Sequence, residues 1–173
     1  LERNFVETLL AEQIILEGLG EAVYGVGKGK PIVAYLSIGT GVGGSRIVNQ
    51  KIDRNALGFE PGHQIIQMEG EPCGCGGKGH LEAYISGDSV ERRYGKKPYD
   101  ITDEKFWDEM AKFLAIGTHN TLVHWSPDII ILGGSMMKQV GIPIERVRFH
   151  LKILSTIFPA PPRIEHAKLG DES

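Results

Sequence analysis

The chain alternates between segments with helical hydrophobic spacing and short, continuous apolar runs. Over residues 4–24, apolar side chains recur at roughly helical spacing, and the glycines that follow end the predicted helix. Residues 31–38 and 128–132 are apolar almost without interruption, which predicts strands buried on both faces. Residues 45–49 and 64–68 predict two further short strands.

Two more helices are predicted in the second half of the chain. Residues 103–125 place apolar side chains on one helical face, with Thr102 or Asp103 available as the N-cap and Pro127 as the stop. Residues 143–157 predict a final amphipathic helix that begins at a proline. Strands that alternate with helices in this way indicate an α/β layer architecture.

Length and charge exclude some classes of protein. A chain of 173 residues can bury a substantial core as one domain. The net charge is −3 and the acids are spread along the chain, so neither a nucleic-acid surface nor a membrane surface is expected. Because no apolar run approaches transmembrane length and no signal peptide precedes the first predicted helix, we expect a cytoplasmic protein.

A cluster of potential metal ligands occupies residues 60–82. Both cysteines of the chain and two of its six histidines fall in this window. His63, Cys73, Cys75 and His80 offer the four sulfur and nitrogen ligands that suit tetrahedral zinc. Such a closed site leaves no position for a catalytic water, so the expected cofactor is a structural Zn²⁺.

The two cysteines also fit two arrangements without a metal. Cys73 and Cys75 could form a strained disulfide, or both could be ordinary buried thiols. A disulfide across one intervening residue closes almost no loop and would stabilise the fold little. With only two cysteines and no secretory signal, a disulfide framework is not favoured.

Several motifs around the cluster, taken in their order along the chain, resemble the ROK family of sugar kinases and repressors. They are Gly39-Thr40-Gly41-Val42-Gly43-Gly44, Glu60-Pro61-Gly62-His63 and the run from Cys73 to Tyr84. In one departure, His80 stands where the family usually has a third cysteine. Histidine can fill a zinc position, so we expect the site to survive with altered affinity. The resemblance implies an actin-like, ribonuclease-H-like ATPase fold, with this chain as its C-terminal lobe carrying an inserted zinc-binding loop over residues 60–82.

The first glycine-rich segment has two possible uses. It lacks the Gly-Lys-Ser/Thr ending of a Walker loop and joins two predicted strands. By itself it favours a hairpin turn with positive φ at several positions. Its backbone N–H groups and a threonine hydroxyl could equally approach phosphate oxygens.

The resemblance implies the phosphate-binding use, and with it a Mg-ATP site. The glycine pair after the second buried strand would be the adenosine-side motif, although a plain strand-to-helix turn also accounts for it. The implied nucleotide-binding residues are Gly39, Thr40, Gly41, Gly43, Gly133 and Gly134.

The resemblance also assigns Glu60, His63 and Glu82 to the sugar. Carboxylates and an imidazole can accept or share hydrogen bonds with several hydroxyls, and a buried acceptor left unpaired is costly. His63 would serve twice, with one ring nitrogen on zinc and the other toward the sugar. Without the resemblance, Glu60 is interpreted as a solvated loop acid, and Glu82 as a helix-start acid favoured by the dipole.

The expected catalytic base is not found at its position. The resemblance implies an Asn-Asp pair whose aspartate takes the proton from the sugar hydroxyl, and these positions fall at Glu12 and Gln13. Glutamine cannot act as a general base, so either the catalytic aspartate is missing or the segment between Gln13 and Leu16 does not correspond to the family. The family's N-terminal Asp-x-Gly-Gly-Thr loop is also absent, and the family continues past the last residues here, so we expect residues 1–173 to be one lobe truncated at both ends.

Together these features predict that the complete protein phosphorylates a hexose or an N-acetylhexosamine with ATP, and the resemblance suggests a homodimer. This chain would supply the zinc site and part of the sugar and phosphate sites. Two alternatives remain, a sugar-responsive ROK transcriptional repressor and a catalytically inactive, zinc-stabilised interaction module.

Overall fold

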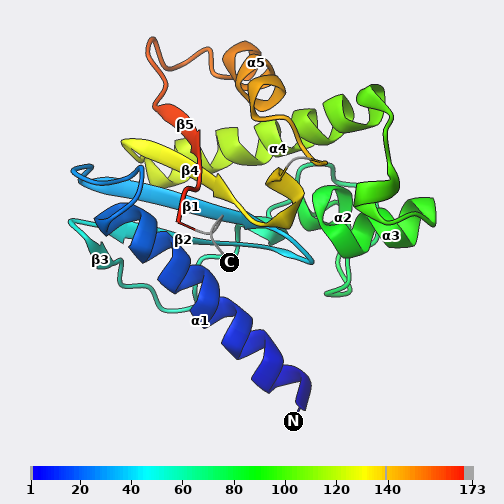
Figure 1. The fold of residues 1–173 in the computed structure, drawn as a ribbon, viewed down its shortest axis with the longest axis horizontal. Helices are drawn as coiled ribbons and strands as arrows, with labels where there is room; N and C mark the ends of the chain where they lie inside the picture. Colours follow the sequence, from blue (N-terminus) through cyan, green and yellow to red (C-terminus); the bar gives the residue numbers. More distant parts are fainter. Residues whose placement is uncertain (1, 139, 170–173) are drawn as a thin grey trace.

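The computed structural model describes the backbone of residues 2–138 and 140–169, with side chains from residue 12 onward. These residues form a mixed five-stranded sheet in the order β3-β2-β1-β4-β5 (Figure 1). β1 pairs antiparallel with β2 and parallel with β4, and β4 pairs parallel with β5. The strands are β1 (Ile32–Ile38), β2 (Val42–Val48), β3 (Lys51–Ile52), β4 (Ile129–Gly133) and β5 (Arg163–His166).

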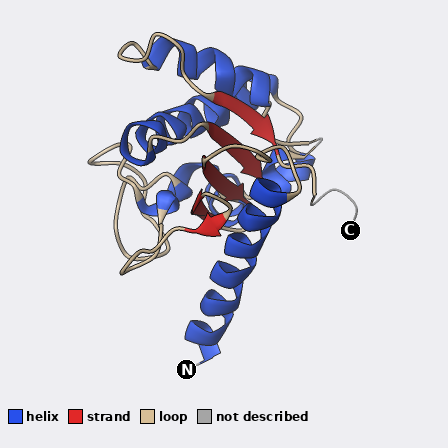
Figure 2. Cartoon of the chain, turned by 90° about the vertical axis from the view of Figure 1, so that its left-hand side faces the viewer, coloured by secondary structure: helices blue, strands red, loops and turns tan. Residues whose placement is uncertain are grey.

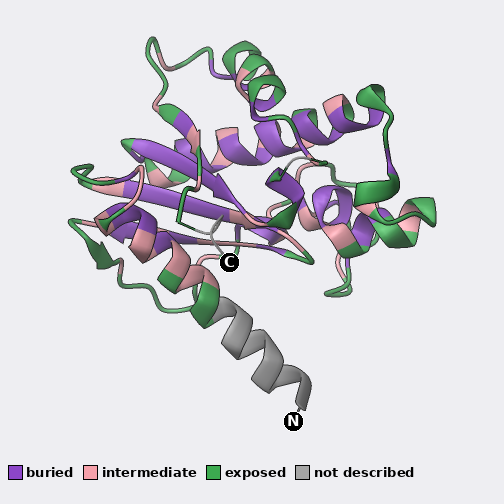
Figure 3. Ribbon diagram, viewed as in Figure 1, coloured by how far each residue is buried: buried purple, intermediate pink, exposed green. Residues whose placement is uncertain are grey.

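Helices cover both faces of the sheet (Figure 2). On one face, α4 (Glu104–Trp125) and α5 (Ile144–Leu154) pack on alternate residues of β1 and β4 in the larger core cluster. On the other face, α1 (Glu2–Val23) packs on the remaining residues in a smaller cluster. β1 and β4 are therefore buried at the centre of the molecule (Figure 3), which explains why both are continuous in apolar residues.

Short helices connect these layers. α2 (Glu82–Ile85) and α3 (Gly87–Tyr94) follow the cysteine loop, and α2 packs beside α4. Three 3-10 turns complete the described elements: η1 (Pro61–His63), η2 (Pro98–Asp100) and η3 (Ser135–Met137). Among the described helices, none combines the length and the hydropathy needed to cross a bilayer.

The predicted limits of α4 are confirmed. The Asp103 side chain caps the helix by accepting a hydrogen bond of 2.9 Å from the backbone N–H of Lys105. At the other end, Ser126 adopts a left-handed conformation with φ of 47°, and Pro127 follows directly. Local capping chemistry therefore sets both ends of this helix.

One sequence-based assignment is wrong: residues 64–68 do not form a strand, because only Ile65 pairs, in an isolated bridge with His80. The final helix predicted over 143–157 is confirmed as α5, but it ends at Leu154, and the unpredicted strand β5 follows it. β5 escaped prediction because its sequence, Arg-Ile-Glu-His, buries only Ile164.

The sheet register brings the two glycine segments to one edge. Ile38 pairs with Val42 at the closed end of the β1–β2 hairpin, and Ser37 pairs with Gly133 across β1 and β4. Because β1 and β4 are parallel, their carboxyl ends meet at the same edge of the sheet. In open α/β sheets this edge is where ligands bind.

Asp108 pairs α4 with α5 and makes stability depend on pH. Its Oδ1 lies 2.5 Å from Arg146 Nε and 2.9 Å from His150 Nε2. These two partners, Arg146 first, lower the pKa of Asp108 from 3.8 to about 2. A carboxyl group whose pKa is lower in the folded state than in the unfolded state stabilises the fold at pH values above its unfolded-state pKa. This stabilisation is lost as the pH falls through the folded-state pKa.

We therefore expect Asp108→Asn to lower the melting temperature at neutral pH, and the difference to vanish between pH 4 and pH 2. The effect should stay below about 1 kcal/mol, because exposed ion pairs are screened by solvent. Thermal unfolding at a series of pH values measures it, with Glu109→Gln on the exposed side of the same helix as the control. An undiminished difference at pH 2 would contradict the assignment.

Candidate functional site

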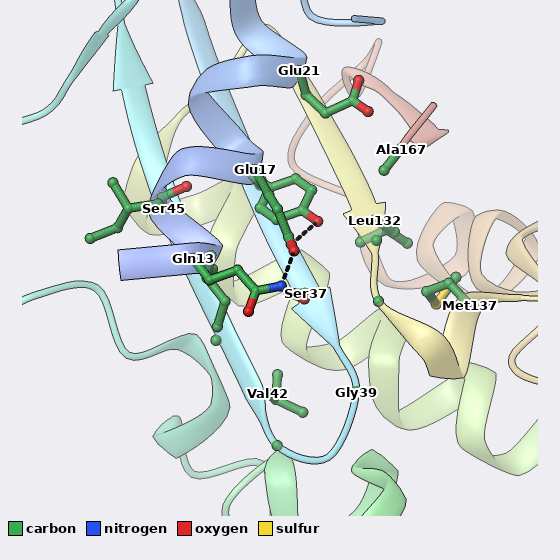
Figure 4. A pocket seen from close by; sticks show the side chains of 18 of the residues that line it. Gln13, Glu17, Glu21, Ser37, Gly39, Val42, Ser45, Leu132, Met137 and Ala167 are labelled. Atoms are coloured by element: carbon green, nitrogen blue, oxygen red, sulfur yellow. Dashed lines mark hydrogen bonds between the residues drawn. The ribbon is translucent and has the colours of Figure 1, made fainter. Parts of the chain in front are cut away.

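An open cavity of about 2020 Å³ lies at the carboxyl edge of the sheet and extends along α1. Figure 4 shows it from close by, between α1, the end of β1 and the end of β4. Its lining includes every residue that the sequence assigned to the sugar and to the nucleotide. These residues are Glu60, His63, Glu82, Gly39, Thr40, Gly41, Gly43, Gly133 and Gly134.

The three residues predicted to bind the sugar lie at the ends of two short helices. Glu60 is the exposed residue that precedes η1, and His63 is the last residue of η1. Glu82 opens α2 and is half-buried. All three line the cavity although 22 positions separate the first from the last, because the intervening loop folds back at His80 to pair with Ile65.

Glu82 connects the phosphate hairpin to the cysteine loop. Its Oε2 accepts a hydrogen bond of 2.8 Å from the backbone N–H of Val42, at the start of β2. Its Oε1 lies 3.8 Å from Cys73 Sγ. A Cβ on Gly41 would come within 2.8 Å of Glu82 Oε2, so glycine is needed there for the carboxylate to reach the hairpin.

The hairpin glycines do not have the positive φ angles expected of them. No glycine between Gly39 and Gly44 has positive φ. Close packing requires glycine at Gly44, where an added Cβ would lie 2.7 Å from the backbone O of Tyr35, and it narrows the space at Gly43. A Cβ on Gly43 would lie 2.5 Å from Ile14 of α1, and one on Gly44 would lie 2.7 Å from Pro61. The expectation was wrong because a tight turn and a close approach both require glycine, and sequence alone does not separate them.

The N-terminus of α3 holds the same hairpin in place. The backbone N–H of Gly87 donates to Gly39 O at 2.7 Å, and that of Asp88 donates to Thr40 O at 3.3 Å. The carbonyl groups of Gly39 and Thr40 are thus engaged by α3.

Gly134, at the end of β4, needs glycine for its backbone conformation, unlike the hairpin glycines. Its φ of 90° and ψ of 165° lie in a region that only glycine adopts readily.

His63, Cys73, Cys75 and His80 come together as a compact set of potential ligands. One ligand atom from each lies within 4.8 Å of all the others. His63 Nδ1 is 3.9 Å from Cys73 Sγ, and Cys75 Sγ is 3.2 Å from His80 Nδ1. Tetrahedral zinc with bonds of about 2.0–2.3 Å needs ligand–ligand spacings of roughly 3.3–3.8 Å. The spacings of 3.2 and 3.9 Å lie near this range and the upper bound of 4.8 Å exceeds it, so the four residues form a cluster that could hold a metal ion.

The loop around this cluster is shaped by backbone turns. The Cys73 N–H donates to Gly77 O at 2.8 Å, and the Gly76 N–H donates back to Cys73 O at 3.0 Å. Gly76 and Gly79 have φ of 92° and 70°. Both cysteines are free thiols, so the disulfide alternative is not formed in this structure. Burial raises the pKa of the Cys73 thiol, which opposes ionisation when no cation is bound.

A hydrogen-bonded network on the α1 side of the cavity was missed by sequence reasoning. Glu17 accepts hydrogen bonds from Tyr35 Oη at 2.8 Å and from Gln13 Nε2 at 2.9 Å (Figure 4). Burial, reinforced by Glu17, raises the pKa of Tyr35, so the phenol keeps its proton and donates. Glu17 follows Gln13 by four residues on one helical face, which was the only signal for the contact in the sequence.

Comparison with known proteins identifies the family. The sequence profile of the ROK family matches residues 2–173. The xylose repressor of Bacillus spizizenii is 30% identical over 156 residues, covering 81% of this chain and 40% of the repressor. A fructokinase of Pediococcus pentosaceus is 32% identical over 162 residues, covering 89% of this chain and 56% of the fructokinase.

A solved structure agrees with this assignment. The ROK hexokinase of Thermus thermophilus superposes with a TM-score of 0.80 at 25% identity, covering 92% of this chain and 59% of the hexokinase. The chain thus spans about half the length of these relatives. Its mixed sheet and this neighbour support an actin-like fold. The chain belongs to the ROK family.

Proposed function

We propose that this chain provides the sugar site and part of the Mg-ATP site of an ATP-dependent sugar kinase of ROK type. One observation carries the proposal: a single cavity is lined both by the acid and imidazole side chains of Glu60, His63 and Glu82 and by the glycine segments that end β1 and β4. Relatives include the Pediococcus fructokinase and an N-acetyl-D-glucosamine kinase of Yersinia pseudotuberculosis, which together support a hexose or an N-acetylhexosamine as the substrate class.

In this proposal the sugar hydroxyls donate to the two carboxylates. Glu82 already uses one oxygen to accept from the Val42 N–H and is thereby held at a defined angle to the cavity. A held carboxylate favours a sugar with a hydroxyl at the matching position, since a buried acceptor without a donor is costly. Glu60 is exposed and would become covered when a sugar binds.

The nucleotide would lie across the carboxyl edge of β1 and β4. When bound, Mg-ATP supplies the transferable phosphoryl group and a metal ion that neutralises its charge. The protein's part is to position the phosphates beside the β1–β2 turn, where the N-terminus of α3 fixes the backbone. Gly134, which lines the cavity at the end of β4, would place its backbone beside the nucleoside.

The four-ligand cluster is proposed to hold a structural zinc ion. Two sulfurs and two nitrogens close the tetrahedral shell, so no position remains for a reacting water. The ion would hold the His63 ring at the wall of the sugar pocket. It would also hold Cys73 as a thiolate against the effect of burial.

Gln13 favours a second candidate, a sugar-responsive regulator without kinase activity. The residue lines the cavity where the family resemblance places the general base, and its amide nitrogen is engaged with Glu17. An amide cannot take a proton from a hydroxyl. The xylose repressor of Bacillus spizizenii matches this chain over a comparable length. A homodimer remains a prediction under either candidate.

The test combines binding and turnover. Zinc content is confirmed first, and a panel of hexoses and N-acetylhexosamines is then titrated into the chain and assayed with ATP for phosphorylation. We expect sugar binding without turnover in the wild-type chain, because no carboxylate occupies the position of Gln13. Turnover with any sugar would show that another group acts as the base. Absence of binding to every sugar would contradict the proposed sugar site.

The variant Gln13→Asp separates the two candidates. Under the kinase proposal, an aspartate at this position restores a proton acceptor, and phosphorylation of the sugar that binds becomes detectable when the variant is assayed in a protein that also supplies the rest of the Mg-ATP site. Under the regulator alternative, the variant binds the same sugar and still fails to transfer phosphate. Gln50→Glu is the control, since Gln50 is exposed, does not line the cavity, and the variant adds the same charge elsewhere.

A further inference from the structure

Glu21 is a buried carboxylate for which the proposed reaction has no use. It lies in the last turns of α1 with only 2% of its surface exposed. Its Oε1 accepts hydrogen bonds from the backbone N–H groups of Lys168 at 2.5 Å and Leu169 at 2.7 Å, and its Oε2 accepts one from Val26 at 3.1 Å. A carboxylate held by three backbone donors fixes the backbone that supplies them.

The backbone that Glu21 fixes is the segment that leaves β5. Figure 4 shows Glu21 pointing from α1 toward Ala167. The Ala167 N–H continues the sheet by donating to Leu132 O at 2.9 Å, and its Cβ lies 3.1 Å from the position of a Cβ on Gly133. Residues 166–169 therefore form a wall of the cavity directly beside the glycine pair, tied to α1 across 147 positions of sequence.

Charge is distributed unevenly along the cavity. Glu60 and Glu82 line the sugar end together with Arg46, which is paired with Asp53, whereas Lys138 and Lys168 line the end at β4 and β5. On the α1 side, Glu17 accepts from Tyr35 and Gln13, and the oxygens of Glu21 are occupied by backbone donors. Lys168 is exposed and lines the cavity. An anionic ligand suits this end better than a neutral sugar.

We propose that Lys168 binds the phosphate oxygens of a phosphoanhydride ligand, either ATP or inorganic polyphosphate, and that Glu21 is the positioning residue that holds Lys168 at the cavity wall. This assignment rests on the proposed function, because it names the contact that the phosphate donor makes at the β4–β5 end. Glu21 acts only through the backbone of residues 168 and 169 and does not touch the ligand.

Isothermal titration of the full chain with Mg-ATP, inorganic tripolyphosphate and adenosine tests the assignment. Lys168→Ala should weaken binding of both phosphate ligands about tenfold, the loss expected for one charge-assisted hydrogen bond. Lys168→Arg should restore most of the affinity, because it keeps the charge. Adenosine should bind equally to all variants. Lys152→Ala, an exposed lysine of α5 outside the cavity, is the control.

Glu21→Gln tests the positioning role with little change in shape. The amide nitrogen of the new glutamine would face a backbone N–H, and two donors cannot form a hydrogen bond. Residues 166–169 should therefore be held less tightly, and the backbone amides of residues 168 and 169 should exchange faster with deuterium. We expect a loss of about three- to tenfold in affinity for the phosphate ligands alone. A purely structural residue would weaken adenosine and the phosphate ligands alike, and that result would overturn the positioning role.

The outcomes separate this assignment from the proposed function. If the wild-type chain binds Mg-ATP and Lys168→Ala binds it equally well, the assignment is overturned while the proposed function stands. If the wild-type chain binds neither ATP nor tripolyphosphate, the proposed function fails, and this assignment fails with it. A loss in Lys168→Ala for tripolyphosphate and not for ATP would identify polyphosphate as the ligand that the lysine holds.

Discussion

The variant His63→Ala is expected to lose zinc and sugar binding together, whereas Glu82→Gln keeps its zinc and loses only sugar affinity. His63 lies in the four-ligand cluster and also lines the cavity, so its ring belongs to both sites. Removing one of four ligands opens the coordination shell and frees the loop that the ion would hold. The sugar pocket should then lose Glu60 and His63 as fixed contacts.

Glu82 provides the matched comparison because it touches the cluster without belonging to it. A glutamine at this position can still accept from the Val42 N–H, so the hairpin should remain in place. The lost charge should lower sugar affinity roughly ten- to hundredfold, the cost of one hydrogen bond to a charged group. Zinc content by mass spectrometry and sugar titration measure the two effects.

His124→Ala is the control for removing a histidine, because His124 is exposed on α4 and does not line the main cavity. It should retain both zinc and sugar. If His63→Ala keeps a full complement of zinc, the proposed ligand set is wrong. If it loses zinc and binds sugar as before, the zinc ion does not shape the sugar pocket.

Replacing Gly134 by alanine should destabilise the fold by about 3 kcal/mol or more, since two penalties act together. The backbone at Gly134 has φ of 90° and ψ of 165°, which a side chain opposes. In addition, the new Cβ would lie 2.3 Å from Ile38 O and 2.7 Å from Ile38 N. These are backbone atoms of the central strand, and they cannot move aside without disturbing the β1–β2 hairpin.

Gly29→Ala isolates the first of these penalties. Gly29 also has positive φ, at 80°, but an added Cβ would meet nothing within 4 Å. Its cost should be about 1 kcal/mol, that of a left-handed conformation alone. Urea denaturation of both variants gives the comparison. Equal losses would show that the backbone of β1 can accommodate a side chain at Gly134, contrary to the packing described above.

Sequence reasoning succeeded where the signal is local. The gathering of His63, Cys73, Cys75 and His80 was predictable because they occur within 18 positions, and a tight loop brings them together whatever the rest of the fold does. α4 was predictable because Asp103 and Pro127 act on the backbone next to them. The central strands were predictable because burial on both faces leaves a continuous apolar run.

It failed where a distant segment supplies the partner. Residues 64–68 look like a strand, but the opposing backbone near His80 pairs with Ile65 alone. β5 buries only Ile164 and exists because β4 offers it a parallel edge. In the β1–β2 hairpin, Gly44 is required by its close approach to the backbone of Tyr35 and to Pro61 rather than by turn geometry.

The sequence by itself determined the alternation of elements, the family and the four residues proposed as metal ligands, because each of these depends on residues that are close together or in a fixed order. Only the tertiary structure showed that the residues proposed to bind sugar and nucleotide line one cavity. It alone also showed that Gln13 and Tyr35 both donate to Glu17 and that Glu21 accepts from the backbone of Lys168. These contacts depend on parallel pairing of β1, β4 and β5 and on the packing of α1 across them. Neither the strand pairing nor the helix packing leaves a pattern in the local sequence. Side chains that meet across a sheet come from distant segments, so the residues next to them in sequence do not reveal the contact.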